Sequence, residues 1–452
     1  MLIAEAVEKR ASDIHLTLAA DAEEGGLLVQ FRLNGSLRIV REIKPWADGD
    51  AMLRAMFQGM AKVADSQVRE GDDQHAVISD AVFLRTADGQ ELPLSGVRLA
   101  RSVTVRGMNL AARLLYRRRE DGQISAQGSA RLARLGYCAR HQRSYARLAR
   151  ETMGINLFTG PTGSGKSTTL AQQLRAIVDA RNDIRVITME DPVEDEFDHP
   201  SIWQYLINNA NSDEEKSTAF AGKLKTALRQ DPDVIMVGEI RGLEVAREAI
   251  NASITGHPVW STLHASDIFM AMPRLVGMGV DRFMLGDPTV LTSLTAQRLV
   301  KTVCPHCAAT VGDIQEILPA DEAKALRMWA RRAPFLGDLS RVRVRREGGC
   351  KHCQGTGESG RTVVAHVVLT DDTLLAELLE HGAAVARRNY AARSDAEPDM
   401  MAHGALKVLS GLVDPRDLVQ ALGAIKPPCE EQRDLTKEDL LTEEELLKEN
   451  NL

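Results

Sequence analysis

The sequence predicts an α/β fold built around a parallel central sheet, preceded by a small α+β domain and interrupted by a cysteine-rich insertion. Three observations support this prediction. From Arg131 onward, short apolar strands alternate with helix-like stretches, which is the pattern of a parallel sheet. A glycine-rich loop, residues 160–167, stands between one such strand and a helix-like stretch. Near the amino end, Asn34-Gly35 separates two strand-like pieces and predicts a β-hairpin.

Length and composition indicate a globular protein of two or three domains. The chain has 452 residues, of which 44% are hydrophobic and 26% charged. A net charge of -7 and an aromatic content of 4% argue against direct nucleic-acid binding, which uses basic surfaces and stacking rings. No apolar run approaches the ~18–20 residues that cross a bilayer, and the first ten residues do not resemble a signal peptide. We therefore expect a cytoplasmic protein whose membrane contacts go only through partners.

Changes in composition divide the chain into four parts. Residues 1–120 mix strand-like and helix-like pieces and predict a small α+β N-terminal domain. Residues 121–130 are rich in Gly, Ser and Gln and predict a linker. Residues 131–426 hold the α/β domain, and residues 427–452 form an acidic tail. We interpret the tail as a solvated amphipathic helix, with a docking tail or an appended segment as alternatives.

The glycine-rich loop matches the P-loop pattern G-x-x-x-x-G-K-[ST] at every fixed position. Its glycines let backbone N–H groups turn toward phosphate oxygens at the start of a helix. Lys166 supplies positive charge to the β- and γ-phosphates, and the Ser167 hydroxyl can ligate Mg²⁺. The candidate nucleotide-binding residues of this loop are Gly160, Pro161, Thr162, Gly163, Ser164, Gly165, Lys166, Ser167 and Thr168.

Carboxylates follow two further apolar strands. Glu239 comes after the strand-like residues 234–237 (VIMV), and Glu190 and Asp191 follow residues 185–188. Because the carboxyl ends of parallel strands meet at one edge of a sheet, we expect these acids beside the P-loop. Glu239 is then the Walker B acid that holds Mg²⁺ through water or orients the attacking water, and Glu190 serves the metal or the water. The alternatives are a helix-capping acid and solubilising charges.

Two arginines and two histidines flank these strands. Arg229 and Arg241 bracket the Walker B strand, and His257 and His264 lie in the strand-like segment 255–264. A phosphoryl-transfer site needs positive charge on the γ-phosphate, often from a neighbouring subunit or domain. Spacing alone leaves open whether these residues belong to the site, form surface ion pairs, or are structural histidines of the core.

Four of the six cysteines form two C-x-x-C pairs, whereas Cys138 and Cys429 stand alone. Four thiolates at this spacing suit a closed tetrahedral Zn²⁺ site that ties a small subdomain together. A redox role for either pair would need a thioredoxin-like context, which the sequence lacks. We expect a zinc subdomain at about residues 303–366, with its own helix at 320–332. The predicted zinc ligands are Cys304, Cys307, Cys350 and Cys353.

Six motifs occur in a fixed order along the chain. They are residues 11–16 (ASDIHL), 31–37 (FRLNGSL), 160–168 (GPTGSGKST), 187–194 (ITMEDPVE), 228–241 (LRQDPDVIMVGEIR) and 255–264 (TGHPVWSTLH). They resemble the N-terminal signature, the hairpin, Walker A, the Asp box, Walker B and the His box of the secretion and type IV pilus assembly ATPases, a hexameric traffic-ATPase family. The resemblance extends from Ala11 to about Gly423, and the ordered set is highly specific.

The resemblance implies a RecA-like P-loop ATPase domain with a parallel central sheet, and a PAS-like N-terminal domain. It implies a homohexamer that hydrolyses ATP with Mg²⁺ and drives an inner-membrane platform protein, which adds pilin-like subunits. The protein would be cytoplasmic and peripheral to the inner membrane, without direct contact to nucleic acid. Carried over by position, the site residues are the catalytic Glu239, Glu190 near the metal and water, His257 and His264 at the γ-phosphate, Arg98 and Arg113 from the N-terminal domain, and Arg229 and Arg241 at the subunit interface.

Departures from the family pattern keep alternatives open. Where the family usually reads GEIRDxET, this chain has Gly242 and Val245 in place of the Asp and the Thr. One alternative is therefore a nucleotide-gated scaffold with little turnover, and another is a hexameric nucleic-acid translocase. The tetracysteine insertion, echoed by residues 349–361 (GCKHCQGTGESGR), and the lack of a C-terminal AIRNLIRE motif favour assembly or export over retraction. We expect the N-terminal docking domain that assembly members commonly carry to be absent or trimmed.

Overall fold

The computed structural model describes residues 2–19, 25–60, 74–80, 82–86, 88–104, 107–116, 128–181, 183–207 and 213–450. The chain divides into two compact units. One comprises residues 1–122 with residues 194–196, and the other comprises residues 123–193 and 197–452. The division near residue 122 falls within the stretch where a linker was expected. No helix of the described residues is long and apolar enough to cross a membrane.

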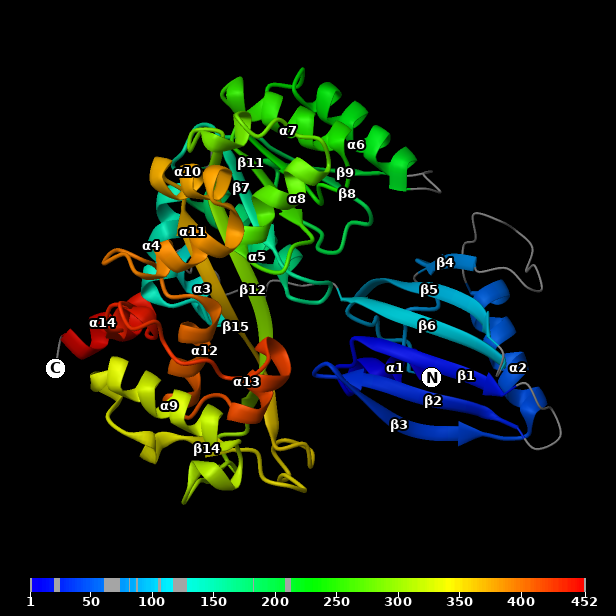
Figure 1. Ribbon diagram of the computed structural model, residues 1–452. Helices are drawn as coiled ribbons and strands as arrows, with labels where there is room; N and C mark the ends of the chain where they lie inside the picture. The colour runs from blue at the N-terminus through cyan, green and yellow to red at the C-terminus, as the bar shows by residue number, and fades with distance from the viewer. Residues whose placement is uncertain are drawn as a thin grey trace. The chain divides into compact units, whose positions relative to one another are not determined.

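The N-terminal unit is an antiparallel sheet with helices (Figure 1). Its strand order is β3-β2-β1-β6-β5-β4. Along β1, alternate side chains are buried, which is the period of two that places one face of a sheet on a core. The predicted hairpin at Asn34-Gly35 is confirmed, because both residues have positive φ, 48° and 85°, between β2 and β3. The elements are α1 (Leu2–Glu8), β1 (Asp13–Ala19), β2 (Leu27–Leu33), β3 (Ser36–Ile43), α2 (Trp46–Arg54), β4 (Gln74–Ile78), β5 (Leu94–Thr104) and β6 (Gly107–Tyr116).

The second unit contains the predicted parallel central sheet, which confirms the fold class. Its seven strands follow the order β15-β12-β7-β11-β10-β8-β9, and all neighbours from β12 to β9 are parallel. Only β15 is antiparallel to its neighbour β12. Most residues of the central strands are buried apolar side chains, as expected for a sheet covered on both faces. The strands are β7 (Ile155–Thr159), β8 (Val186–Glu190), β9 (Ile202–Leu206), β10 (Val234–Val237), β11 (Val259–Leu263), β12 (Leu291–Val303) and β15 (Glu358–Leu369).

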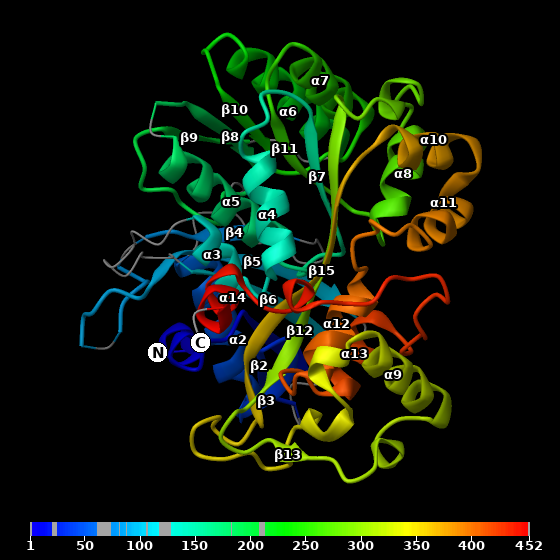
Figure 2. The same cartoon turned by 90° about the vertical axis from the view of Figure 1, so that its left-hand side faces the viewer.

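Helices cover both faces of this sheet (Figures 1 and 2). On one face, α3 (Gly128–Leu135), α4 (Ala139–Leu148) and α5 (Lys166–Ala180) bury Phe158 and Trp260 of the sheet in one core. On the other face, α6 (Asp213–Ala227) and α7 (Leu243–Ile254) pack over Leu157 and Ile235 in a second core. The second core also includes residues of α8 (Ala271–Gly277), α10 (Asp372–Glu380) and α11 (Gly382–Ala391).

The cysteine-rich insertion joins β12 to β15. These two long strands continue beyond the sheet into a separate lobe, visible at the bottom of Figure 2. The lobe has its own core, which combines α9 with the later helices α12 and α13. Because β15 belongs to the central sheet, the insertion covers residues 304–357 and ends earlier than the expected 366. Its elements and their packing partners are β13 (Ala309–Thr310), α9 (Ala320–Arg332), β14 (Arg343–Val344), α12 (Met400–Leu409) and α13 (Pro415–Leu422).

The acidic tail is not solvated along its whole length, so our interpretation of it is wrong for residues 427–441. Leu435 is 3% exposed in the core of the lobe, and Asp439 is fully buried. Asp439 binds Arg433 at 2.8 Å and Arg140 of α4 at 2.7 Å. The backbone N–H of Ala139 donates to the carbonyl of Leu441 at 2.7 Å. The tail docks through Arg140, which is distant in sequence and binds the Asp439 carboxylate together with Arg433 of the tail itself. It ends in α14 (Glu443–Asn450).

Candidate nucleotide site and cysteine clusters

The P-loop forms the connection between β7 and α5. Its two flanking glycines, Gly160 and Gly165, have positive φ of 147° and 88°. A Cβ on Gly160 would lie 2.5 Å from Ser164 Oγ, and one on Gly165 would lie 3.2 Å from Gln297 Nε2. Both positions therefore need a residue without a side chain. The resulting compact turn, followed by the amino end of a helix of 15 residues, suits a phosphate group.

Lys166 and Ser167 stand at the start of α5. Lys166 is only 8% exposed, and its Nζ donates hydrogen bonds to the carbonyls of Gly160 at 2.6 Å and Pro161 at 3.1 Å. The loop thus holds its cation close to its own backbone. Ser167 is exposed on the first turn of α5. The two side chains can serve a phosphate and a magnesium ion respectively.

Glu239 stands just beyond β10 and contacts two of the predicted site residues. Its Oε2 accepts a hydrogen bond from Arg241 Nε at 2.8 Å, and its Oε1 lies 3.0 Å from His264 Nε2. The carboxylate is 16% exposed. It therefore keeps access to solvent while two neighbours fix its direction. A carboxylate that accepts a proton from an attacking water needs both this access and this fixed orientation.

His264 follows β11, and β11 lies between the P-loop strand and β10. Burial lowers the pKa of His264, and the cations Lys166, Arg241 and Arg274 lower it further, against the opposing effect of Glu239. The ring is therefore neutral at neutral pH and can donate its Nε2 proton to the Glu239 carboxylate. Lys166 lies near enough to lower the pKa of His264, so the lysine, the histidine and Glu239 share one edge of the sheet.

Glu190 ends β8 on the same edge. It is 7% exposed and accepts hydrogen bonds from Thr188 Oγ1 at 2.7 Å and Gln204 Nε2 at 3.0 Å. A Cβ on Gly238 would lie 3.9 Å from Glu190 Cγ, so the end of β8 directly adjoins the residue before Glu239. The two glutamates therefore reach the same edge from neighbouring strands, as the sequence predicts.

Two other candidates lie at the opposite side of the sheet, where the amino ends of the parallel strands meet. His257 precedes β11, where Val259 N donates to Gly154 O at the start of the P-loop strand. Its Nδ1 lies 3.3 Å from Ala252 O. Arg229 precedes β10 and is exposed. Each is separated from the P-loop edge by the length of a strand, so any role at a phosphate would have to involve a neighbouring copy of the chain.

Arg98 and Arg113 belong to the N-terminal unit and face each other across β5 and β6. Arg113 Nε donates to Asp13 Oδ1 at 3.0 Å, and half of the Arg113 side chain is exposed. Arg98 is partly exposed. The sequence-predicted pair is thus brought together on one face of the N-terminal sheet.

Sequence reasoning missed Gln297, which lies under the P-loop. This residue of β12 is fully buried, and its Nε2 donates to Ser164 O at 2.9 Å. Its Oε1 accepts a hydrogen bond from the Tyr137 hydroxyl at 2.7 Å. No local motif marks either residue, because the contact joins segments more than 130 positions apart in sequence. Only the pairing of β12 with β7 brings them together.

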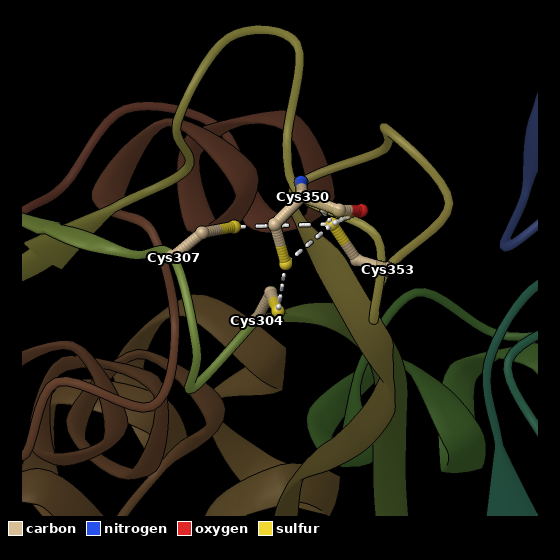
Figure 3. A group of neighbouring side chains, drawn as sticks. All are labelled: Cys304, Cys307, Cys350 and Cys353. Carbon is tan, nitrogen blue, oxygen red and sulfur yellow. Dashed lines mark hydrogen bonds between the residues drawn. The ribbon is translucent and has the colours of Figure 1, made fainter.

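The four predicted zinc ligands converge (Figure 3). The Sγ–Sγ distances are 3.9 Å for Cys304–Cys350, 3.8 Å for Cys307–Cys353 and 3.8 Å for Cys350–Cys353. A tetrahedral zinc ion with Zn–S bonds of about 2.3 Å separates its sulfurs by about 3.8 Å, whereas a disulfide needs about 2.05 Å. The spacing fits a zinc ion and excludes a disulfide.

Backbone donors favour thiolates at this cluster. Burial opposes ionisation of Cys353, but the N–H groups of Cys350 and Gly357, at 3.1 and 3.2 Å from its Sγ, lower its pKa to about 6. Burial and the neighbouring cysteines raise the pKa of Cys307 to about 12. Four thiolates can therefore share this site only around a cation, and the donor set is the one that zinc prefers.

A second group of potential ligands is formed by Cys138, His141 and His403. Their ligand atoms lie within 4.8 Å of one another, and all three residues are buried. His403 Nδ1 accepts the backbone N–H of Ala365 at 3.1 Å, so the neutral ring carries its proton on Nε2 and offers no lone pair there. Burial raises the pKa of Cys138 to about 12. Lys407 also lies near enough to lower the pKa of both histidines. These neighbours do not fit a metal ion.

Comparison with known proteins identifies the family of this chain. The model of the family "Type II/IV secretion system protein" matches residues 1–422. The chain is 33% identical to the type II secretion system protein E of Aeromonas hydrophila over 410 residues, which are 91% of this chain and 72% of that protein.

A second relative and a solved structure point the same way. The chain is 34% identical to the type II secretion system ATPase E of Vibrio cholerae serotype O1 over 374 residues, 82% of this chain and 65% of that one. The crystal structure of the Legionella pneumophila ATPase DotB shares the fold, with a TM-score of 0.59 at 20% identity, covering 92% of each chain. The chain therefore belongs to the type II/IV secretion system protein family and is an ATPase.

Proposed function

We propose that this chain is the Mg²⁺-dependent motor of a homohexameric ring that powers the assembly of pilin or pseudopilin subunits for a type IV pilus or a type II secretion system. The observation that carries the proposal is the convergence of Lys166, Glu239, His264 and Glu190 at one edge of the sheet. This is the set of charges that phosphoryl transfer to water requires: a cation for the phosphates, a base for the water and an acid for the metal.

Each residue has a separate task in the proposed reaction. Lys166 leaves its two loop carbonyls and pairs with the β- and γ-phosphates. Glu239, held by Arg241 and His264, accepts the proton of the water that attacks the γ-phosphate. His264 is neutral, and its Nε2–H can continue to donate a hydrogen bond to Glu239 Oε1 while the carboxylate takes up the proton. Preorganised charges of this kind supply most of the catalysis in phosphoryl transfer.

The exposed Ser167 hydroxyl and the Glu190 carboxylate fit a magnesium ion, because hard oxygen ligands are what this ion takes. When bound, the ion neutralises charge on the β- and γ-phosphates. Glu190 is held in place by hydrogen bonds from Thr188 and Gln204. We propose that the four cysteines of the lobe hold a structural zinc ion.

The remaining candidates act between copies or units in this proposal. Arg229 and His257 lie away from the P-loop edge of their own sheet and would contribute at the subunit interface, as would Arg241 in part. In this proposal Arg98 and Arg113 contribute their guanidinium groups to the bound nucleotide. The ring would work at the cytoplasmic side of the inner membrane on a platform protein, and it would touch membrane only through partners.

The test is ATP hydrolysis by the purified protein and by Lys166→Ala and Glu239→Gln, with light scattering on the same samples. We expect Mg²⁺-dependent hydrolysis by a species of about six chains and a loss of at least 100-fold in both variants. The matched control is Glu380→Gln, because Glu380 is an acid at the end of α10 that is 69% exposed and lies 3.9 Å from His381. Its activity should equal that of the wild type.

Three results would contradict the proposal. An assembled ring that binds ATP without hydrolysing it would indicate a nucleotide-gated scaffold. Stimulation of hydrolysis by DNA, lost at high salt, would indicate a nucleic-acid translocase. Full activity in Glu239→Gln would remove Glu239 from the role of base.

A further inference from the structure

Tyr137 occupies the turn between α3 and α4, the first two helices of the ATPase unit. Its side chain is fully buried, and its hydroxyl lies among polar partners inside the unit. Burial raises the pKa of this phenol far above its usual range, so it stays protonated. It can therefore donate one hydrogen bond, and that bond goes to Gln297 Oε1 at 2.7 Å.

The hydrogen bonds around this phenol run in one direction. Because Tyr137 donates to Gln297, the Thr169 hydroxyl 3.1 Å away must be the donor to the Tyr137 oxygen. Gln297 then has its oxygen satisfied by Tyr137, and its Nε2 donates to Ser164 O at 2.9 Å. A flip of the Gln297 amide would set its oxygen against the Ser164 carbonyl. The Ser164 carbonyl, which can only accept, thus selects the amide orientation of Gln297, and the hydrogen bond from the Tyr137 hydroxyl to Oε1 holds the amide in that orientation.

The P-loop rests on Gln297 at two points. The first is the hydrogen bond to Ser164. The second is the backbone carbonyl of Gln297, which packs so close to Gly160 that a Cβ there would lie 2.8 Å from its oxygen. Ser164 itself is 3% exposed and precedes the two residues that open α5. The orientation of the peptide units around Ser164 decides where the loop N–H groups point. Holding its carbonyl therefore presets the loop for a phosphate.

Tyr137 is in turn fixed by the helices on either side. Its N–H donates to Leu132 O at 3.2 Å, and its carbonyl accepts from Gln142 Nε2 at 2.7 Å. The preceding Gly136 carbonyl accepts from Lys407 Nζ at 2.6 Å. These contacts fix the backbone from which the phenol projects. The position of α3 and α4 is thereby transmitted to the phosphate-binding loop.

We propose that Tyr137 is a positioning residue for nucleotide binding, acting through Gln297 on the Ser164 carbonyl. This inference rests on the proposed function, because it assumes that the P-loop binds ATP and ADP. The competing explanation is that Tyr137 only stabilises the fold, like any buried tyrosine with a satisfied hydroxyl. The two explanations differ in whether nucleotide affinity changes together with stability.

The first test is Tyr137→Phe in the full-length protein, which removes one oxygen and keeps the ring. We expect the Kd for ADP, measured by calorimetry, to rise about five- to tenfold, and the KM for ATP to rise by a similar factor with kcat within about twofold. The matched control is Tyr390→Phe. Tyr390 is also buried, but its hydroxyl accepts only the Glu397 N–H at 3.1 Å. This control should lose stability without any change in ADP affinity.

The second test asks whether Tyr137 acts through Gln297. Gln297→Met should weaken ADP binding at least as much as Tyr137→Phe, and the double variant should bind ADP no more weakly than Gln297→Met alone. Fully additive losses, or an unchanged Kd for ADP in Tyr137→Phe together with reduced stability, would overturn the inference. A wild-type protein that binds neither ADP nor ATP would instead refute the proposed function.

Discussion

The two cysteine-containing clusters of the ATPase unit are both built from residue types that bind zinc, but only one of them suits a metal ion. The tetracysteine cluster and the group of Cys138, His141 and His403 each place their potential ligand atoms within 4.8 Å. In the first, backbone N–H groups point at Cys353 Sγ and lower its pKa to about 6. In the second, the backbone N–H of Ala365 donates to His403 Nδ1, so the lone pair of the neutral ring is not available to a metal ion.

The charges around the second cluster widen this difference. Lys407, whose pKa burial lowers to about 7, brings no negative counter-charge to a metal ion. The one nearby carboxylate, Asp439, is already bound by Arg433 and Arg140. A metal ion would therefore meet a proton on His403 Nε2 and the nearby Lys407. The comparison teaches that backbone donors and second neighbours, more than the ligands themselves, decide whether such a cluster is a metal site.

The largest effect should come from the metal content of the two clusters. We expect one zinc ion per chain by elemental analysis, none in Cys350→Ser, and an unchanged content in Cys138→Ala. Because the zinc would close the loop between β12 and β15, Cys350→Ser should also destabilise the lobe by several kcal/mol. The lobe would then be cut by protease at residues 304–357 while the P-loop core stays intact. Two zinc ions per chain, one of them lost in Cys138→Ala, would contradict the conclusion that the second cluster holds no metal.

The second prediction concerns Asp439, the carboxylate that the second cluster cannot use. Asp439→Ala leaves Arg433 and Arg140 without their buried partner, so the free energy of unfolding should fall by about 3 kcal/mol. The matched control is Glu438→Ala, because Glu438 pairs with Arg143 at 2.6 Å but is 42% exposed. Surface pairs contribute about 1 kcal/mol or less. Urea denaturation of both variants measures the difference, and equal losses would show that the tail is not docked through Asp439.

The tetracysteine cluster and the P-loop were predictable from sequence for the same reason. In each, spacing within a few residues fixes the chemistry: C-x-x-C brings two sulfurs to one turn, and the glycine pattern fixes a loop between a strand and a helix. The fold class also followed, because alternating apolar strands and helices predict a parallel sheet. Glu239 and Glu190 were found because both follow strands whose ends share one edge.

What the sequence could not show depends on contacts between distant segments. Gln297 carries no local signal, and it supports the P-loop only because β12 pairs with β7. The docked tail was misjudged because its partners, Arg140 among them, lie about 300 positions earlier. Cys138 looked isolated, although His141 follows three residues later on α4, and the approach of α12 adds His403 as a second histidine neighbour. The roles expected for Arg229 and His257 stay predictions, since both lie on the far edge of their own sheet.

The smallest predicted effect is a loss of stability at acid pH that arises from His141 of the second cluster. Burial, with a smaller effect of Lys407, lowers the pKa of His141 to about 3, while an unfolded histidine has a pKa of about 6.5. Between these values the unfolded chain binds a proton that the folded chain excludes. The free energy of unfolding therefore falls as the pH drops below 6.5, by about 1.4 kcal/mol at pH 5.5 for this one residue.

His141→Phe should remove that share of the acid sensitivity, because phenylalanine fills a similar space and does not titrate. Urea denaturation at pH 7.5 and pH 5.5 measures the change: the loss between the two should be about 1.4 kcal/mol smaller in the variant than in the wild type. The buried histidines His366 and His403, whose pKa values are also lowered, keep their own share in both proteins. An equal loss in both would mean that His141 takes up its proton in the folded state. A steeper wild-type loss that a chelator abolishes would mean that the second cluster holds a metal after all, and the contrast between the clusters would then lie in affinity rather than in kind.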